Sequence, residues 1–152
     1  MKKIKTAVAT ISICILLGAW NQPDCRNLNV AYAVDLSPNL SRLDKSRDSI
    51  LVEKNEIELH FREDINGNYK ILINDSLFFE GKLKGDPRIG YEPRVFNIPV
   101  RPGNNVLTLG DLEREQQSVT IKLNTTYKYL ILQKQHHCTI LAKSANKRPF
   151  RG

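Results

Sequence analysis

The sequence lacks the short motifs that mark the common classes of enzyme. It has no Gly-x-Ser-x-Gly, no His-Glu-x-x-His and no glycine-rich phosphate loop. Its acidic residues, such as Glu56, Glu58 and Glu80, fall at strand positions that should face water. We therefore predict a protein that is not an enzyme and needs no cofactor. The alternative is a small secreted or envelope-associated hydrolase, or an inhibitor of one, because folding can bring distant carboxylates together.

The chain also lacks an apolar run of the length that usually spans a membrane. Its longest run, residues 7–20, has 14 residues, against the roughly 20 that cross a bilayer as a helix. Three lysines precede this run, and the small residues Ala31 and Ala33 follow it. A basic start, a short apolar core and a small-x-small site are typical of a secretory signal peptide. Residues 1–33 are therefore predicted to be a signal peptide that is cleaved after Ala33.

One feature of this leader leaves an alternative open. The polar stretch 21–30 is long for the segment that precedes a cleavage site. The apolar run could instead remain as an uncleaved anchor, since a short segment can still dock in lipid. In both cases the protein is predicted to be exported, to the periplasm, the envelope or the extracellular space.

Cysteine is scarce, with three residues at positions 14, 25 and 138. Cleavage after Ala33 leaves Cys138 alone, whereas an uncleaved chain could pair Cys25 with Cys138 in an oxidising compartment. We expect Cys138 to be a small buried hydrophobic residue in a strand. His136 and Cys138 would share one strand face, and with His60 they are weak candidates for a zinc or copper site. Three or four convergent ligands are needed, so no metal is predicted.

Positive charge is concentrated at the two ends of the chain. Residues 34–142 carry 15 basic and 15 acidic residues, whereas residues 143–152 carry four basic residues and no acid. A balanced body argues against a dedicated nucleic-acid binder. Residues 143–152 are predicted to be a basic flexible tail. Membrane contact is expected only through this tail or an uncleaved N-terminal segment.

Hydrophobic residues alternate with polar ones from Glu56 onward. This period of two predicts a half-buried strand at residues 56–62, with one face in water. Asn66-Gly67 and the alternation after it predict a hairpin to the next strand. Further short runs follow to residue 142, while residues 34–55 form a linker or a short helix. The pattern predicts an all-β fold, an antiparallel β-sandwich of seven to eight short strands, at residues 56–142.

The turns of this domain resemble those of a known family. Residues 71–76, Glu80-Gly81 and residues 100–109, with their Pro-Gly turn, are similar to PEGA-type domains, which are small β-sandwich modules of exported bacterial proteins. The resemblance covers residues 69–132, with Ser76 and Asn105 departing from the family pattern. It implies a β-sandwich at the cell surface with a structural or binding role, and it implies no catalytic residues.

Aromatic side chains are the candidates for a binding surface. Phe79, Tyr91, Tyr127 and Tyr129 could stack on a sugar or enter a groove on a protein. Tyr127 and Tyr129 are expected to share a strand face, and the neighbours Phe78 and Phe79 to point in opposite directions. The sequence thus predicts an exported binding or structural module whose partner is an envelope or extracellular protein or a glycan.

Overall fold

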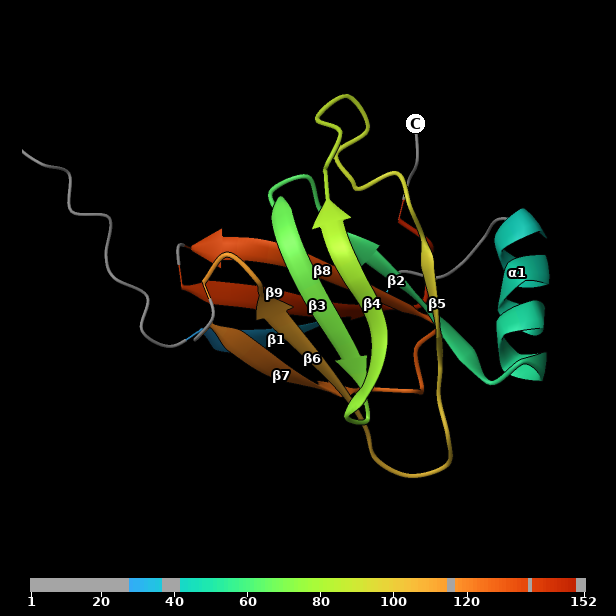
Figure 1. The fold of residues 1–152 in the computed structure, drawn as a ribbon. Coiled ribbons are helices and arrows are strands. Elements are labelled where there is room, and N and C mark those ends of the chain that lie inside the picture. The colour runs from blue at the N-terminus through green and yellow to red at the C-terminus, as the bar shows by residue number, and fades with distance from the viewer. Residues whose placement is uncertain (1–27, 37–41, 115–116, 137, 150–152) are drawn as a thin grey trace, which may run out of the picture.

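The structure is a computed structural model, and it describes residues 28–36, 42–114, 117–136 and 138–149. These parts form nine strands and one helix (Figure 1). None of the helical segments in these ranges is long and apolar enough to cross a membrane. The elements are β1 (Asn29–Asp35), α1 (Arg42–Glu53), β2 (Glu56–Phe61), β3 (Gly67–Ile73), β4 (Ser76–Leu83), β5 (Phe96–Pro99), β6 (Asn105–Asp111), β7 (Ser118–Leu123), β8 (Tyr129–His136) and β9 (Thr139–Ala145).

The strands form two sheets, which confirms the predicted β-sandwich. One sheet has the order β1-β9-β8-β2-β5, and the other has the order β4-β3-β6-β7. The four-stranded sheet is antiparallel throughout. The five-stranded sheet contains two parallel pairs, β1 with β9 and β2 with β8, which the sequence did not predict. Parallel neighbours need a long connection, and here the rest of the domain supplies it.

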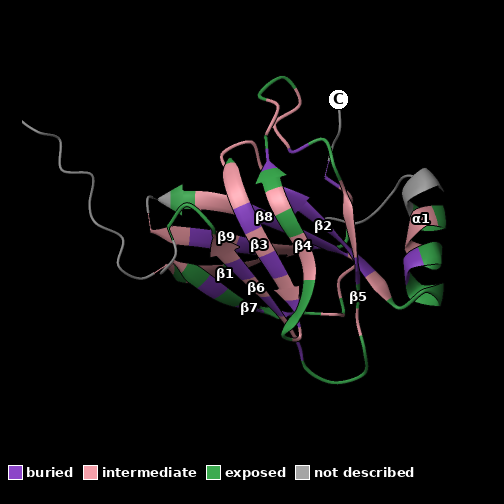
Figure 2. Ribbon diagram, viewed as in Figure 1, coloured by how far each residue is buried: buried purple, intermediate pink, exposed green. Residues whose placement is uncertain are grey.

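The hydrophobic core lies between the two sheets. In β7 the side chains alternate strictly between exposed and buried, as expected for a strand with one wet face. Figure 2 shows the same alternation of buried and less buried residues along β3 and β7. Each fully buried aliphatic or aromatic side chain stabilises the fold by roughly 1.5–3 kcal/mol. The largest core side chains include Phe61, Leu59, Ile71, Leu107, Leu109 and Ile121.

The predicted Asn66-Gly67 hairpin is wrong. β2 belongs to the five-stranded sheet and β3 to the four-stranded sheet, so the chain crosses between sheets at this point. Ile65 is fully buried on the way across, and the side-chain oxygen of Asn66 accepts a hydrogen bond from the Gly85 amide at 2.8 Å. Gly67 has φ of 134°, which glycine adopts readily. The Asn-Gly pair therefore shapes a crossing and not a hairpin.

The tight hairpin is Asn74-Asp75, between β3 and β4. Both residues have positive φ, 49° and 64°, as a type I′ turn requires. The Asn74 side chain accepts from the Val106 amide at 3.0 Å and donates to Asn105 Oδ1 at 3.1 Å. Asn105 is 2% exposed, and its amide side chain also bonds the backbone N–H and C=O of Arg101 at 3.0 and 2.7 Å. Asn105 thus joins the hairpin to the turn before β6.

The C-terminal residues are more ordered than the predicted basic tail. β9 continues to Ala145, and the Lys143 ammonium pairs with Asp35 at 2.9 Å. Arg148 contacts a buried glutamate of β2. The prediction of a flexible tail is therefore wrong for residues 143–149, because two of its basic side chains have acidic partners in the fold. Residues 150–152 lie outside the described part of the chain.

The end of the predicted leader overlaps β1 of the five-stranded sheet. Of the predicted leader, residues 1–27 lie outside the described residues. Ala31 and Ala33 lie in β1, opposite Leu141 and Lys143 of β9. The region 34–55 contains the end of β1 and α1, so its helical alternative is the one observed.

We expect Asn105→Ala to lower the free energy of unfolding by about 2 kcal/mol, since buried backbone and amide groups lose their partners. Chemical denaturation measures the change. Asn104, its exposed neighbour, supplies the control, and Asn104→Ala should leave stability within about 0.5 kcal/mol of the parent. Equal losses in the two variants would contradict the role assigned to Asn105.

Candidate functional site

The outer face of β2 carries the most deeply buried charged group among the described residues. Glu58 and His60 are 0% and 1% exposed. The prediction that this face lies in water is therefore wrong. α1 packs against β2, and Arg47 of α1 and Arg148 after β9 both reach Glu58. A helix and a C-terminal segment cover what an isolated sheet would expose.

The Glu58 cluster consists of Glu58, Arg47, Arg148 and His60. Arg47 Nε donates to Glu58 Oε1 at 2.7 Å, and its Nη2 donates to Asn97 Oδ1 at 2.9 Å. Arg148 donates to both carboxylate oxygens, at 3.0 and 3.3 Å. His60 Nε2 lies 3.1 Å from Glu58 Oε2. An ionised carboxylate only accepts hydrogen bonds, so Nε2 of His60 carries the proton.

The surroundings of Glu58 keep it ionised. Burial is the largest single influence and raises its pKa, but hydrogen bonds from His60 and Arg47, with the charges nearby, together outweigh burial and lower the pKa from 4.5 to about 2. Both oxygens are engaged by donors. Glu58 is thus a poor proton donor or base near neutral pH, where a catalytic group needs a pKa close to the working pH. The cluster fastens α1 and the C-terminal segment to β2.

Tyr129 also holds α1 against the sheet, and it is not an exposed binding residue. It is 1% exposed, and its hydroxyl donates to Asp48 Oδ1 of α1 at 2.5 Å. Leu51 of α1 packs in the same small core cluster. Tyr127 lies in the bend before β8 and is half-buried. The expected pair of tyrosines on one strand face is therefore wrong, because β8 begins only at Tyr129.

Tyr91, another candidate, packs beside the cluster. It is half-buried, and its ring centroid lies 6.4 Å from that of His60 in an edge-on arrangement. The guanidinium of Arg62 lies over the same ring at 4.8 Å from the centroid. Such cation–π contacts contribute about 0.5–1 kcal/mol at exposed sites. Tyr91 thus covers the cluster from the loop after β4.

Two of the three weak metal candidates, His60 and Cys138, are engaged by other partners. His60 bonds Glu58, and Cys138 is disulfide-bonded, so it offers no thiolate and is not the free hydrophobic residue that we expected. His136 ends β8. Within the described ranges, no three His, Cys, Asp or Glu side chains are grouped so that they could hold a metal ion.

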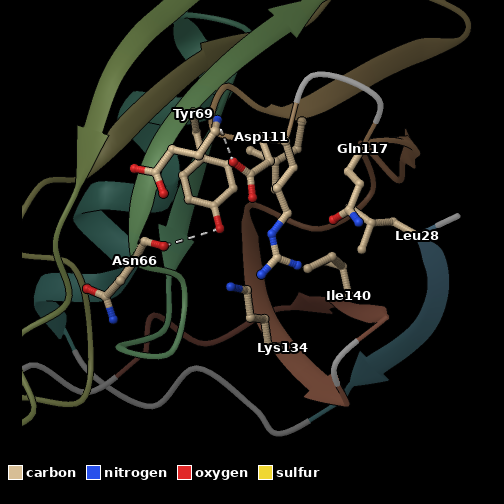
Figure 3. Close-up of a pocket in the computed structure, with 10 residues that line it drawn as sticks. Leu28, Asn66, Tyr69, Asp111, Gln117, Lys134 and Ile140 are labelled. Carbon is tan, nitrogen blue, oxygen red and sulfur yellow. Dashed lines mark hydrogen bonds between the residues drawn. The ribbon is translucent and has the colours of Figure 1, made fainter. Parts of the chain in front are cut away.

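A small polar cavity opens at the end of the sandwich near the turn between β6 and β7 (Figure 3). Its volume is about 120 Å³, below the 300–1,000 Å³ of typical ligand sites. Burial, with Asp111 nearby, raises the pKa of Tyr69 to about 12, so its hydroxyl stays protonated. Lys134 lies across the cavity from Tyr69 (Figure 3). The space suits a few water molecules better than a substrate.

Phenylalanines close the gap between β4 and β5, the adjacent end strands of the two sheets. Ile71 pairs with Phe79 and Leu72 with Leu77, which leaves Phe78 as the extra residue of a β-bulge. Phe78 and Phe79 therefore both reach the Phe96 ring of β5, at centroid distances of 6.4 and 5.0 Å. The expectation that they point in opposite directions is wrong, because the bulge breaks the alternation.

Arg94 closes one end of this gap. Its guanidinium lies 5.2 Å from the ring centroid of Phe79 and 5.8 Å from that of Phe96. Its Nε donates to Glu92 Oε1 at 2.8 Å, and its Nη2 donates to the Lys82 carbonyl of β4. The edge of β4 is thus covered near its C-terminal end.

The other end of the gap is open. An apolar groove of about 380 Å³ lies where β4 begins and β5 ends, within the size range of ligand sites. Leu77 on its wall is 60% exposed. We call this the β4–β5 groove, and it is lined by Ile73, Asn74, Ser76, Leu77, Phe78, Pro99, Val100 and Arg101. The sequence analysis chose Phe79 as a candidate binding residue and did not choose Leu77 or Phe78. These two line the groove because of the bulge at Phe78, which strand periodicity does not reveal.

Comparison with known proteins adds no assignment: no family model, curated protein or solved structure matches the chain.

The Glu58 cluster predicts how stability changes with pH. The pKa of Glu58 is lower in the folded chain than its ordinary value of 4.5, so its stabilisation is complete above pH 4.5 and is lost as the pH falls toward 2. We expect the free energy of unfolding to fall by on the order of 3 kcal/mol from this group alone over that range.

Glu58→Gln should remove this part of the pH dependence and should also destabilise the protein at neutral pH. The exposed Glu80 of β4 provides the control, because Glu80→Gln should keep the parental slope. Denaturant unfolding at a series of pH values measures both quantities. A Glu58→Gln variant with the parental slope would refute the assignment.

Proposed function

We propose that the protein is an exported, non-enzymatic β-sandwich module that binds another protein through the β4–β5 groove. The groove itself carries this proposal, because it combines ligand size, an apolar lining and an exposed leucine. Apolar surface that is gathered in one exposed place is a common feature of protein interaction sites. Export rests on the leader-like pattern of residues 1–33.

The form of the groove favours an extended partner segment with apolar side chains. Among the described strands, β4 and β5 each have a neighbour on one side only. Their outer edges can therefore offer backbone hydrogen bonds to an added strand, while the groove receives alternate side chains. Arg101, exposed at the rim, favours an acidic residue at one flank of that segment.

The hydrolase alternative has less support from the described residues. An enzyme needs titratable groups that converge on space for a substrate. The oxygens of Glu58 are engaged by Arg47, Arg148 and His60, and the polar cavity beside Tyr69 is small. Of the residues placed by the structure, Arg101 is the one charged residue that lines the groove. The turns that resemble PEGA-type domains agree with a binding or structural role.

A charge placed in the groove should weaken partner binding. We expect Leu77→Asp to weaken binding at least about tenfold, since burying an unpaired carboxylate costs more than 1.4 kcal/mol. The measurement is quantitative capture of envelope and extracellular proteins on the immobilised exported chain, followed by titration of each captured protein.

Leu112 offers a matched control, because it is also an exposed leucine, at 40%, but lies outside the groove. Leu112→Asp should bind as the parent does, and both variants should keep the parental melting temperature within a few degrees. Equal binding by parent and Leu77→Asp would refute the groove as the site. Retention of a glycan in place of a protein would refute the proposed class of partner.

A further inference from the structure

β1 forms one edge of the five-stranded sheet (Figure 1), and among the described strands β9 is its one neighbour. At one end of the strand the Asn29 amide donates to the Cys138 carbonyl at 2.8 Å, and at the other end the Asp35 carbonyl accepts from the Asn146 amide at 3.4 Å. Odd-numbered residues of β1 therefore direct their backbone groups to β9, since these directions alternate along a strand. The N–H and C=O groups of residues 30, 32 and 34 point the opposite way, along the outer edge.

The other edge strands of the two described sheets carry features that hinder the addition of a further strand. β4 has its bulge at Phe78, β5 has four residues and ends in Pro99, and β7 contains Lys122, whose amide donates to the Tyr32 hydroxyl at 3.1 Å. Bulges, short length, proline and lysine are the usual protections of an edge. β1 has seven residues in unbroken register and none of these features. It is therefore a template for pairing with another strand.

The sequence around β1 reads almost the same in both directions. Residues 28–36 are Leu-Asn-Val-Ala-Tyr-Ala-Val-Asp-Leu, and only Asn29 and Asp35 break the symmetry about Tyr32. Two such strands that run antiparallel about Tyr32 set leucine opposite leucine, valine opposite valine and alanine opposite alanine. The remaining pair sets the Asn29 amide, a donor, opposite the Asp35 carboxylate, an acceptor. A second copy of the chain thus matches this edge residue by residue.

The burial of the inner face of β1 is complementary in the same register. Leu28 and Val30 pack against the main core, whereas Val34 and Leu36 are 50% and 71% exposed. All four lie on one face, because side chains alternate along a strand. In the antiparallel register, the exposed pair of one copy lies beside the core-packed pair of the other. Pairing therefore gives the exposed side chains apolar neighbours.

We propose that two copies of the chain form a dimer, in which their β1 strands pair antiparallel about a two-fold axis at Tyr32. The two five-stranded sheets then become one continuous sheet. Both copies use the same surface, so the contact closes at two copies. The β4–β5 groove lies on other edge strands, so dimer formation is independent of the proposed binding of a partner protein.

The first test compares the parent with Val34→Pro and Val34→Thr, each expressed as the full chain. Mass spectrometry of the purified protein identifies its N-terminus, and sedimentation equilibrium over a range of concentrations measures the dissociation constant of the dimer. Proline removes the outward N–H of residue 34 but none of the bonds to β9. The two-fold axis repeats the loss, so we expect a dissociation constant at least about tenfold higher. Val34→Thr keeps the N–H and the β-branched shape, and it should dimerise as the parent does.

The second test examines the register by disulfide cross-linking. At the axis, the two copies of residue 32 would form a hydrogen-bonded pair with Cα atoms roughly 5.5 Å apart, within the range that a disulfide spans. The two copies of residue 34 would lie roughly 14 Å apart. After mild oxidation, Tyr32→Cys should therefore give a covalent dimer on a non-reducing gel, whereas Val34→Cys and the parent should not.

A parent that sediments as a monomer would overturn the proposal, as would a series of larger oligomers or unchanged dimerisation of Val34→Pro. Equal cross-linking of Tyr32→Cys and Val34→Cys would overturn the register. If Val34→Pro does not fold, the two cysteine variants decide the question. A purified chain that begins at Val34 would also overturn the proposal, because it lacks most of β1. Capture of partner proteins through the β4–β5 groove would be unchanged by any of these results.

Discussion

The buried carboxylate of Glu58 is the interaction on which the architecture outside the core depends. It joins three parts of the chain, because its partners Arg47 and Arg148 lie 11 and 90 residues away in sequence. A lone ionised group at 0% exposure would cost several kcal/mol. Two guanidinium groups and an imidazole offset that cost only if α1 and the C-terminal segment are both in place. The charge therefore specifies the arrangement as much as it stabilises it.

The β4–β5 side of the sandwich is closed by apolar side chains instead of charged ones. Phe78, Phe79 and Phe96 seal the two sheet edges there, and Arg94 covers one end of the seal. The bulge that brings both phenylalanines to one side also ends the regular edge of β4. The groove lies beside this bulge, where Leu77 is 60% exposed.

The sequence predicted the sandwich because alternation is a local signal that each inner-facing strand carries. It predicted wrongly that the second face of β2 lies in water, since the cover comes from Arg47 and Arg148, which are distant in sequence. It missed the crossing at Asn66-Gly67 because Asn-Gly specifies backbone conformation and not which strands then pair. The candidate site was missed for a related reason. The extra residue Phe78 breaks the alternation of β4, so strand periodicity does not predict which side its neighbours face.

The N-terminal strand shows a deeper ambiguity in such patterns. Small residues two apart, such as Ala31 and Ala33, satisfy a peptidase site, and they equally satisfy one face of an edge strand. Sequence cannot separate these meanings, because both depend on side-chain size at alternate positions. Pairing separates them: β1 completes the edge of the five-stranded sheet and places Leu28 and Val30 on the core. A leader that ended inside this strand would remove part of the fold that it exports.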